Sequence, residues 1–220
     1  MYRSARSFVL ALCFIASTLA VAQTGVVSPL DTLSDSAVPE AVRSALGTKG
    51  YRITLDDGSI ACELWLAKNL STQATKDVPG VAYPQLAESA FVGVLHFPKQ
   101  GSDYRGQPIA AGYYSLRYEL LPNDGNHLGA APNRDFLLLL PAASDPDPAA
   151  SLKVPDVMDR SRKASGTRHP APLSLLQPDS SPTSSITKGE EDHWIFSTAI
   201  PVASGGTFPI ALVVKGQAQQ

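Results

Sequence analysis

Residues 51–66 read Tyr-Arg-Ile-Thr-Leu-Asp-Asp-Gly-Ser-Ile-Ala-Cys-Glu-Leu-Trp-Leu, and their pattern is the strongest indication of secondary structure in the chain. Apolar and polar side chains alternate on both sides of a central Asp57-Gly58 pair. Alternation with a period of two is typical of a β-strand that buries one face, and Asp-Gly is a hairpin turn signal. The stretch therefore predicts a β-hairpin. Cys62 lies on its buried face, where a small core residue is favoured over a reactive thiol.

Similar strand patterns recur along the rest of the chain. They predict strands at 91–97, 113–121, 136–140, 173–176, 193–200 and 208–215. Between most of them there is no helical pattern of crossover length, so the sheet should be mainly antiparallel. We expect a mainly β protein, an antiparallel β-sandwich of about seven to eight strands, with a partly open barrel as the alternative.

The expected domain covers residues 37–216 and is followed by a tail at 217–220. It should begin with one short N-terminal helix, because Ser36 can cap it, Pro39 suits its first turn and Gly47 stops it. Residues 142–192 are rich in Pro, Ser, Asp and Lys, and we expect a long, largely irregular insert there, with a short helix near 157–163. Residues 23–36 should form a flexible arm.

Residues 1–22 predict a cleavable secretory signal peptide. Two arginines precede an uncharged apolar run over 8–20, and Ala20-Val21-Ala22 places small residues before the cut. The run is shorter than the roughly 20 residues of a membrane span, so we expect no transmembrane anchor. The mature, soluble domain should then be periplasmic or extracellular. Cleavage would also remove Cys13, so that Cys62 would have no cysteine partner for an internal disulfide.

The charge balance narrows the class of partner. The first 22 residues hold two of the 18 basic side chains and none of the 20 acidic ones, so cleavage would leave a net charge of −4. The sequence contains no basic patch, which argues against nucleic acid. The expected partner is a small molecule, a glycan or another protein of the cell envelope.

The loop between the strands at 113–121 and 136–140 is the first candidate site. It carries Asp124, Asn126, His127, Arg134 and Asp135. Long loops often carry function, and a carboxylate beside an imidazole suits general acid–base chemistry or a metal foothold. Asn126, Arg134 and Asp135 are candidate binding residues, and Asp124 and His127 are candidate catalytic ones. In the other interpretation, the Asp and Asn side chains bond the local backbone and shape the turn.

The histidines and a basic segment give further candidates. The spacing of the four histidines matches no metal signature, so no cofactor is predicted, although a divalent metal at His127, His169 and His193 remains open. His96, on a strand, is better interpreted as a packed or rim residue. The segment 161–170 contains four basic side chains and could bind an anionic group, with a solvated loop as the other interpretation.

Two strand residues that face away from the apolar register complete the list. Arg117 shares its face with Glu119 and is a candidate binding residue. Trp65 faces outward beside Glu63, where it can stack on a sugar or a partner surface. Alternatively, Trp65 lies under the helix or the Pro-rich segment.

Several motifs also carry a resemblance to known proteins. They are Gly50-Tyr51-Arg52, Cys62-Glu63-Leu64-Trp65, Asp103-Tyr104-Arg105-Gly106-Gln107-Pro108-Ile109, Ala111-Gly112-Tyr113-Tyr114-Ser115-Leu116-Arg117-Tyr118, Asp124-Gly125-Asn126-His127 and Arg134-Asp135-Phe136. Together they resemble a group of uncharacterised exported bacterial proteins with a β-rich chain, and this resemblance implies no activity. The strand at 111–116 alone is also similar to the AGTYSL strand of the domain-of-unknown-function family 2911.

Two functions follow from these observations. The first is a non-catalytic, exported β-sandwich that binds a ligand or a partner in the cell envelope. The alternative is a metal-assisted or acid–base hydrolase-like enzyme that uses Asp124, His127 and His169. The sequence shows no complete set of nucleophile, base and orienting group, which favours binding. The enzyme would need His127 close to His169, His193 or an acid in one concave pocket.

Overall fold

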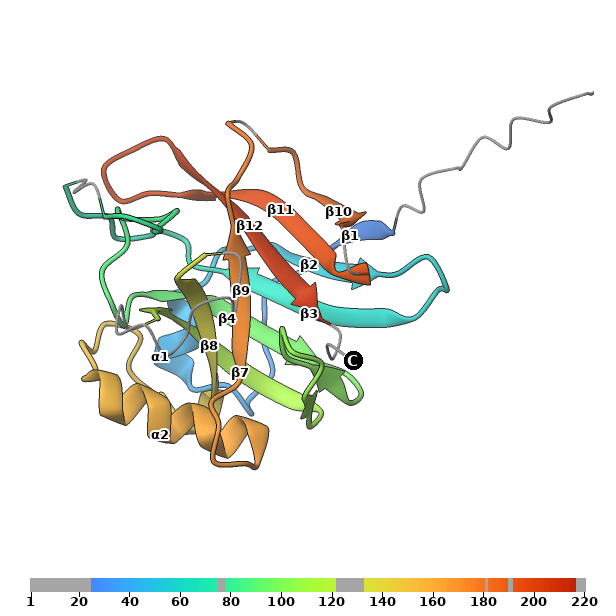
Figure 1. Ribbon diagram of the computed structural model, residues 1–220, viewed down its shortest axis with the longest axis horizontal. Helices are drawn as coiled ribbons and strands as arrows, with labels where there is room; N and C mark the ends of the chain where they lie inside the picture. Colours follow the sequence, from blue (N-terminus) through green and yellow to red (C-terminus); the bar gives the residue numbers. More distant parts are fainter. Residues whose placement is uncertain (1–24, 75–77, 122–132, 181, 190–191, 217–220) are drawn as a thin grey trace, which may run out of the picture.

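The computed structural model describes residues 25–74, 78–121, 133–180, 182–189 and 192–216. Ten strands form one antiparallel sheet that curls until its two edge strands contact one another (Figure 1). From edge to edge the strands are β1 (Val26–Leu30), β2 (Gly50–Thr54), β3 (Ile60–Leu66), β4 (Phe91–Phe97), β7 (Gly112–Leu120), β8 (Asp135–Pro141), β9 (Pro172–Leu176), β12 (Thr207–Lys215), β11 (Trp194–Pro201) and β10 (Ser185–Lys188).

The mainly β, antiparallel character is confirmed, but the sandwich of seven to eight strands is wrong. The reason is strand β9, which pairs with β8 on one side and with β12 on the other. This single strand joins two groups of strands that would otherwise be separate sheets. The result is one nearly closed sheet, closer to the partly open barrel than to two stacked layers.

The hairpin at 51–66 forms as predicted, with Tyr51 opposite Leu64 and Ile53 opposite Cys62. Gly58 has a φ of 78°, a left-handed conformation that glycine adopts without steric cost. Cys62 is fully buried, and this burial raises the pKa of its thiol. The thiol therefore stays protonated and packs as a small core residue.

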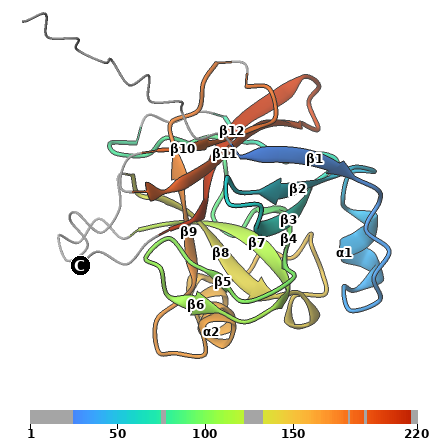
Figure 2. The ribbon, with the colours of Figure 1, turned by 90° about the vertical axis from the view of Figure 1, so that its right-hand side faces the viewer.

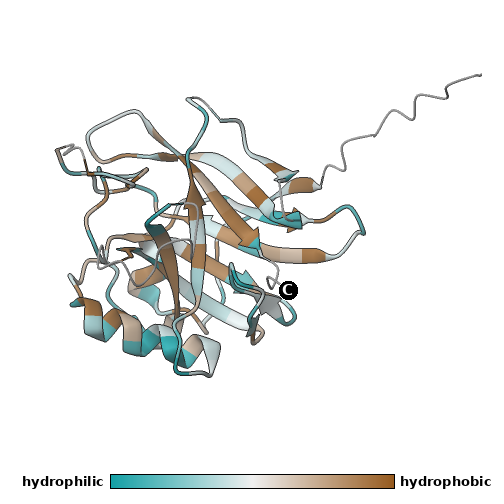
Figure 3. Cartoon of the chain, in the orientation of Figure 1, coloured by the Kyte–Doolittle hydropathy of each residue, from teal (hydrophilic) through white to brown (hydrophobic). Residues whose placement is uncertain are grey.

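The interior of the curled sheet is filled by the inward side chains of the strands, among them Leu64, Leu95, Leu116, Leu137 and Leu212. Brown residues lie mainly along the strands in Figure 3, and many of the teal residues lie in the turns and on α2. Each such buried leucine contributes about 1.5–3 kcal/mol by leaving water. A tyrosine fastens the join at β9, because the Tyr83 hydroxyl donates to the Leu176 carbonyl and accepts from the Ala211 amide.

The outer face of the sheet is covered in two places by helices (Figure 2). The predicted N-terminal helix is α1 (Glu40–Ser44), which packs Val42 against Trp65 and Val94. Trp65 lies so close to the backbone that a Cβ at Gly50 would be 2.4 Å from its Nε1. On another part of the sheet, α2 (Val154–Ser165) places Val157 on Leu138 and Leu140.

Two predicted irregular regions contain regular structure. The expected arm at 23–36 contains β1, which pairs along its whole length with β2. The expected, largely irregular insert at 142–192 contains the predicted helix, as α2, and the predicted strand, as β9. It also contains the short helix η1 (Ala142–Ser144) and strand β10, which were not predicted. Helix α2 begins with a proline in its first turn and ends at Gly166, whose φ of 65° gives a left-handed cap.

A separate two-stranded hairpin, β5 (Gly101–Ser102) and β6 (Pro108–Ile109), lies beside α2. Within the described ranges, no helix is long and apolar enough to cross a membrane.

Candidate functional site

A pocket of about 320 Å³ lies on the outer face of β7 and β8, beside α2 and the turn that follows β5. Its walls are mainly apolar and consist of Tyr104, Leu120, Leu121, Phe136, Leu138, Met158, Pro170 and Pro172. Ligand pockets of about 300–1,000 Å³ with apolar walls and a few polar groups are typical of small-molecule sites. The pocket is therefore at the small end of the usual size range.

Glu119 is the polar group on the sheet side of this pocket. It alternates with the inward residues of β7 and is only 4% exposed. By hydrogen-bond geometry neither carboxylate oxygen has a partner among the described residues. The Ser89 amide donates to the Tyr118 carbonyl at 2.7 Å, but it lies close enough to Glu119 to lower the pKa of that carboxyl in part. Burial, and after it the charge of Glu88, raise the pKa of Glu119 to about 7. A buried carboxyl without a partner is uncommon and requires an explanation.

The rim of the pocket is basic. Arg105, Arg162, Arg168 and His169 all line it and are exposed. Arg162 pairs with Asp159 and donates from Nε to the Arg168 carbonyl. Across the described part of the chain, the side chains of Arg168 and His169 make no hydrogen bond or ion pair, so they are available to a ligand.

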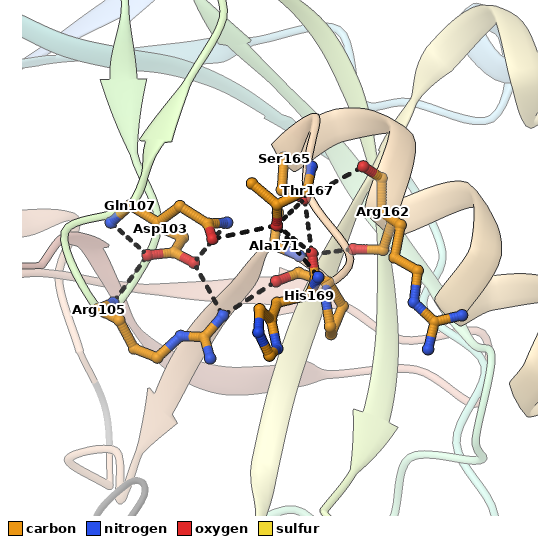
Figure 4. A network of polar contacts seen from close by, with 10 residues as sticks. Asp103, Arg105, Gln107, Arg162, Ser165, Thr167, His169 and Ala171 are labelled. Carbon is orange, nitrogen blue, oxygen red and sulfur yellow. Dashed lines mark hydrogen bonds and ion pairs between the residues drawn. The ribbon is translucent and has the colours of Figure 1, made fainter.

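Buried polar groups hold this rim in place (Figure 4). The Asp103 carboxylate accepts from the amides of Arg105 and Gln107, each at 2.9 Å. Nη2 of Arg105 lies 3.5 Å from the same carboxylate and donates to the Pro170 carbonyl at 3.2 Å. Burial raises the pKa of Asp103, and these contacts lower it by less.

Hydroxyl groups organise the loop after α2 in the same way. The Ser165 hydroxyl donates to the His169 carbonyl, and the Thr167 hydroxyl accepts from the His169 amide. The Thr167 hydroxyl also donates to Gln107, which links this loop to the turn after β5 (Figure 4). The backbone that carries Arg168 and His169 is therefore preorganised.

Only some of the predicted catalytic and metal-binding residues lie in the described part of the chain. Asp124, Asn126 and His127 lie outside the described residues. His169 lines the pocket, and the ring of His193 lies 4.9 Å from that of Tyr104, a wall residue. Where the chain is described, no group of three or more His, Cys, Asp or Glu residues could hold a metal ion.

Arg117 is buried under the segment that follows η1. Its Nε and Nη2 donate to the Asp145 carboxylate at 2.8 and 2.9 Å. The carbonyls of Ser89, Asp147, Pro148 and Ala150 accept its remaining hydrogen bonds. Arg117 borders an open pocket of about 410 Å³, but all its donors are engaged by the protein. It therefore has none left for a ligand.

The other predicted binding residues also make internal contacts. Asp135 is fully buried and accepts from the amides of Ala82 and Tyr83 and from the Tyr118 hydroxyl. Arg134 donates to the carbonyl of Leu121. These two residues hold neighbouring backbone against β8.

Trp65 is buried beneath α1, and its Nε1 donates to the Asp31 carbonyl. This is the position that the alternative interpretation of Trp65 describes.

Sequence reasoning did not single out Glu119 as a site residue. The alternation of 113–121 places it on the outward face, but no local pattern shows that α2 covers that face. Sequence reasoning also did not pair His96 with a carboxylate, yet its Nδ1 lies 2.9 Å from Glu63 and its ring stacks on Tyr113 at 4.1 Å. The positions of Glu63 and His96 on neighbouring strands are the signal that could have found this contact.

A comparison of the chain with protein-family models, curated proteins and solved structures finds no match. The resemblance described above therefore rests on the sequence motifs alone.

Proposed function

We propose that this chain is an exported, non-catalytic binding protein of the cell envelope. Its pocket beside Glu119 takes an amphipathic anion, a small molecule with an apolar body and one anionic head. One observation carries the proposal: a mainly apolar pocket opens at a rim of three exposed arginines and a histidine.

The two parts of such a ligand match the two parts of the pocket. An apolar body gains about 25 cal/mol for each Å² that leaves water against the aliphatic and aromatic walls. A carboxylate, sulfonate or phosphate head suits the planar, multiply donating guanidinium group. Because Asp159 and Asp103 already engage Arg162 and Arg105, Arg168 supplies most of the uncompensated charge.

Two fluorescent probes test this function. Anilinonaphthalenesulfonate has an aromatic body with one sulfonate, and phenylnaphthylamine has the same body without it. We expect the folded protein to bind the sulfonate probe more tightly, because only this probe has a charge for the rim. Fluorescence titration measures both affinities. If neither probe binds, or if both bind equally, the proposed ligand class is wrong.

A charge variant locates the site. The substitution Arg168→Gln should lower the affinity for the sulfonate probe about threefold, as expected for one exposed charge. The affinity for the neutral probe should not change. Lys163→Gln is the matched control, because Lys163 is an exposed cation of α2 that does not line the pocket. Equal weakening by both substitutions would indicate a general charge effect rather than this rim.

The hydrolase-like alternative remains a hypothesis with one member in the pocket, His169. Its other two residues, Asp124 and His127, lie outside the described residues.

A further inference from the structure

Glu119 is the one acidic side chain among the described residues that line the pocket. Its carboxylate oxygens are buried and unpartnered, while every other wall position is apolar or belongs to the basic rim. An ionised carboxylate in such a place has lost its water, and the nearby Ser89 amide and Arg117 offset that loss only in part. A neutral carboxyl group is compatible with the same surroundings and can donate a hydrogen bond.

The charged groups around Glu119 come from several elements. Glu88, from the segment before β4, acts against ionisation, and Arg117 of β7 acts for it. The effect of Arg117 is limited, because its guanidinium is already paired with Asp145. Beyond these, the rim residues Arg162 of α2, Arg168 and His169 after it, and Arg105 from the turn after β5 face the pocket.

A ligand of the proposed class would shift Glu119 toward its neutral form. Its apolar body would exclude water from the pocket beside Glu119, and its anionic head at the rim would bring a second negative charge to the same pocket. Both changes disfavour the ionised form. Ligand binding and protonation of Glu119 must then favour each other, because such coupling is reciprocal.

We propose that the pocket binds its amphipathic anion together with one proton, which the Glu119 carboxylate takes up from solvent and returns when the ligand leaves. This inference rests on the proposed function.

Calorimetry with anilinonaphthalenesulfonate tests the coupling. Titrations at pH 7 in two buffers that differ in ionisation enthalpy measure the number of protons taken up. We expect about half a proton for each probe bound, since Glu119 is half ionised there before binding. The affinity should fall about tenfold between pH 6 and pH 8. Glu119→Gln, which keeps a neutral donor, should lose most of this uptake and most of this fall.

His169→Asn is the matched control, because histidine side chains ordinarily titrate near neutrality and His169 lines the same pocket. This variant should retain the proton uptake. Three results would each overturn the inference while leaving the binding function intact: binding without uptake in the wild-type protein, uptake of unchanged size in Glu119→Gln, or uptake that disappears in His169→Asn. If the wild-type protein does not bind the probe, the proposed function fails instead.

Discussion

Arg117 and Glu119 are two residues apart on the same face of β7, and both are almost fully buried, yet their hydrogen bonding differs. All three nitrogens of the Arg117 guanidinium donate hydrogen bonds to a carboxylate or to backbone carbonyls. Among the described residues, the Glu119 carboxylate has no partner. Burial of a charged residue is therefore not the mark of a site. A better indication is a buried charged group that the protein leaves without a hydrogen-bond partner, and of these two residues Glu119 is the one in that state.

The largest predicted effect is on the free energy of unfolding when Arg117 loses its ion-pair partner. Asp145→Ala would leave a buried guanidinium without its counter-ion, and we expect a loss of about 3–5 kcal/mol in the free energy of unfolding. Urea denaturation measures it. The control is Asp147→Ala, because that side chain is at an exposed position and only its carbonyl contacts Arg117. Equal losses in the two variants would mean that the ion pair is dispensable.

Glu119 should have a smaller effect on stability, and this effect should depend on pH. The folded protein holds the pKa of Glu119 at about 7, above its ordinary value of 4.5. Ionisation is thus disfavoured by folding, and stability should fall as the pH rises from about 4.5 to 7. Glu119→Gln should remove this loss and stabilise the protein at pH 8 by on the order of 2 kcal/mol, with little change at pH 4.

The measurement is urea denaturation of wild type and variant at both pH values. A variant that is less stable than wild type at pH 8 would show that the carboxylate has a favourable partner, and the contrast with Arg117 would disappear.

The smallest predicted effect concerns the influence of Glu88 on the pKa of Glu119. Glu88 is exposed, and its charge adds to burial in raising the pKa of Glu119. Glu88→Gln should lower the midpoint of the stability loss by on the order of 0.3 pH unit, because exposed charges interact weakly through water. Stability profiles against pH give this midpoint. A shift to higher pH would contradict the repulsive role of Glu88.

The comparison also shows where sequence reasoning reaches its limit. Period-two alternation is a local property, so the hairpin at 51–66 and the outward face of Arg117 and Glu119 follow from it. What covers that face is decided by segments far along the chain, α2 and the residues after η1. The sequence therefore predicts that Arg117 is available for binding. In the structure, however, Asp145 and four carbonyls accept hydrogen bonds from its guanidinium.

The fold has the same division between local and distant causes. Strand β1 contains Pro29 and is only five residues long, so its sequence gives no alternation, and its structure depends on pairing with β2. Strand β9 was expected from its apolar residues, but the choice between two sheets and one depends on its partners. Those partners, β8 and β12, are set by tertiary packing rather than by the sequence of β9.

The join at β9 also sets an order of events in folding. Strands β1 to β8 pair largely with chain neighbours, whereas β9 meets β12 through only two residue pairs. The hydrogen bond from the Ala211 amide to the Tyr83 hydroxyl spans 128 residues. Bringing such distant residues together has a loop-closure entropy cost, and because of this cost such contacts form slowly. We therefore expect the hairpins to form early and the closure of the sheet at β9 to be the slow, final step.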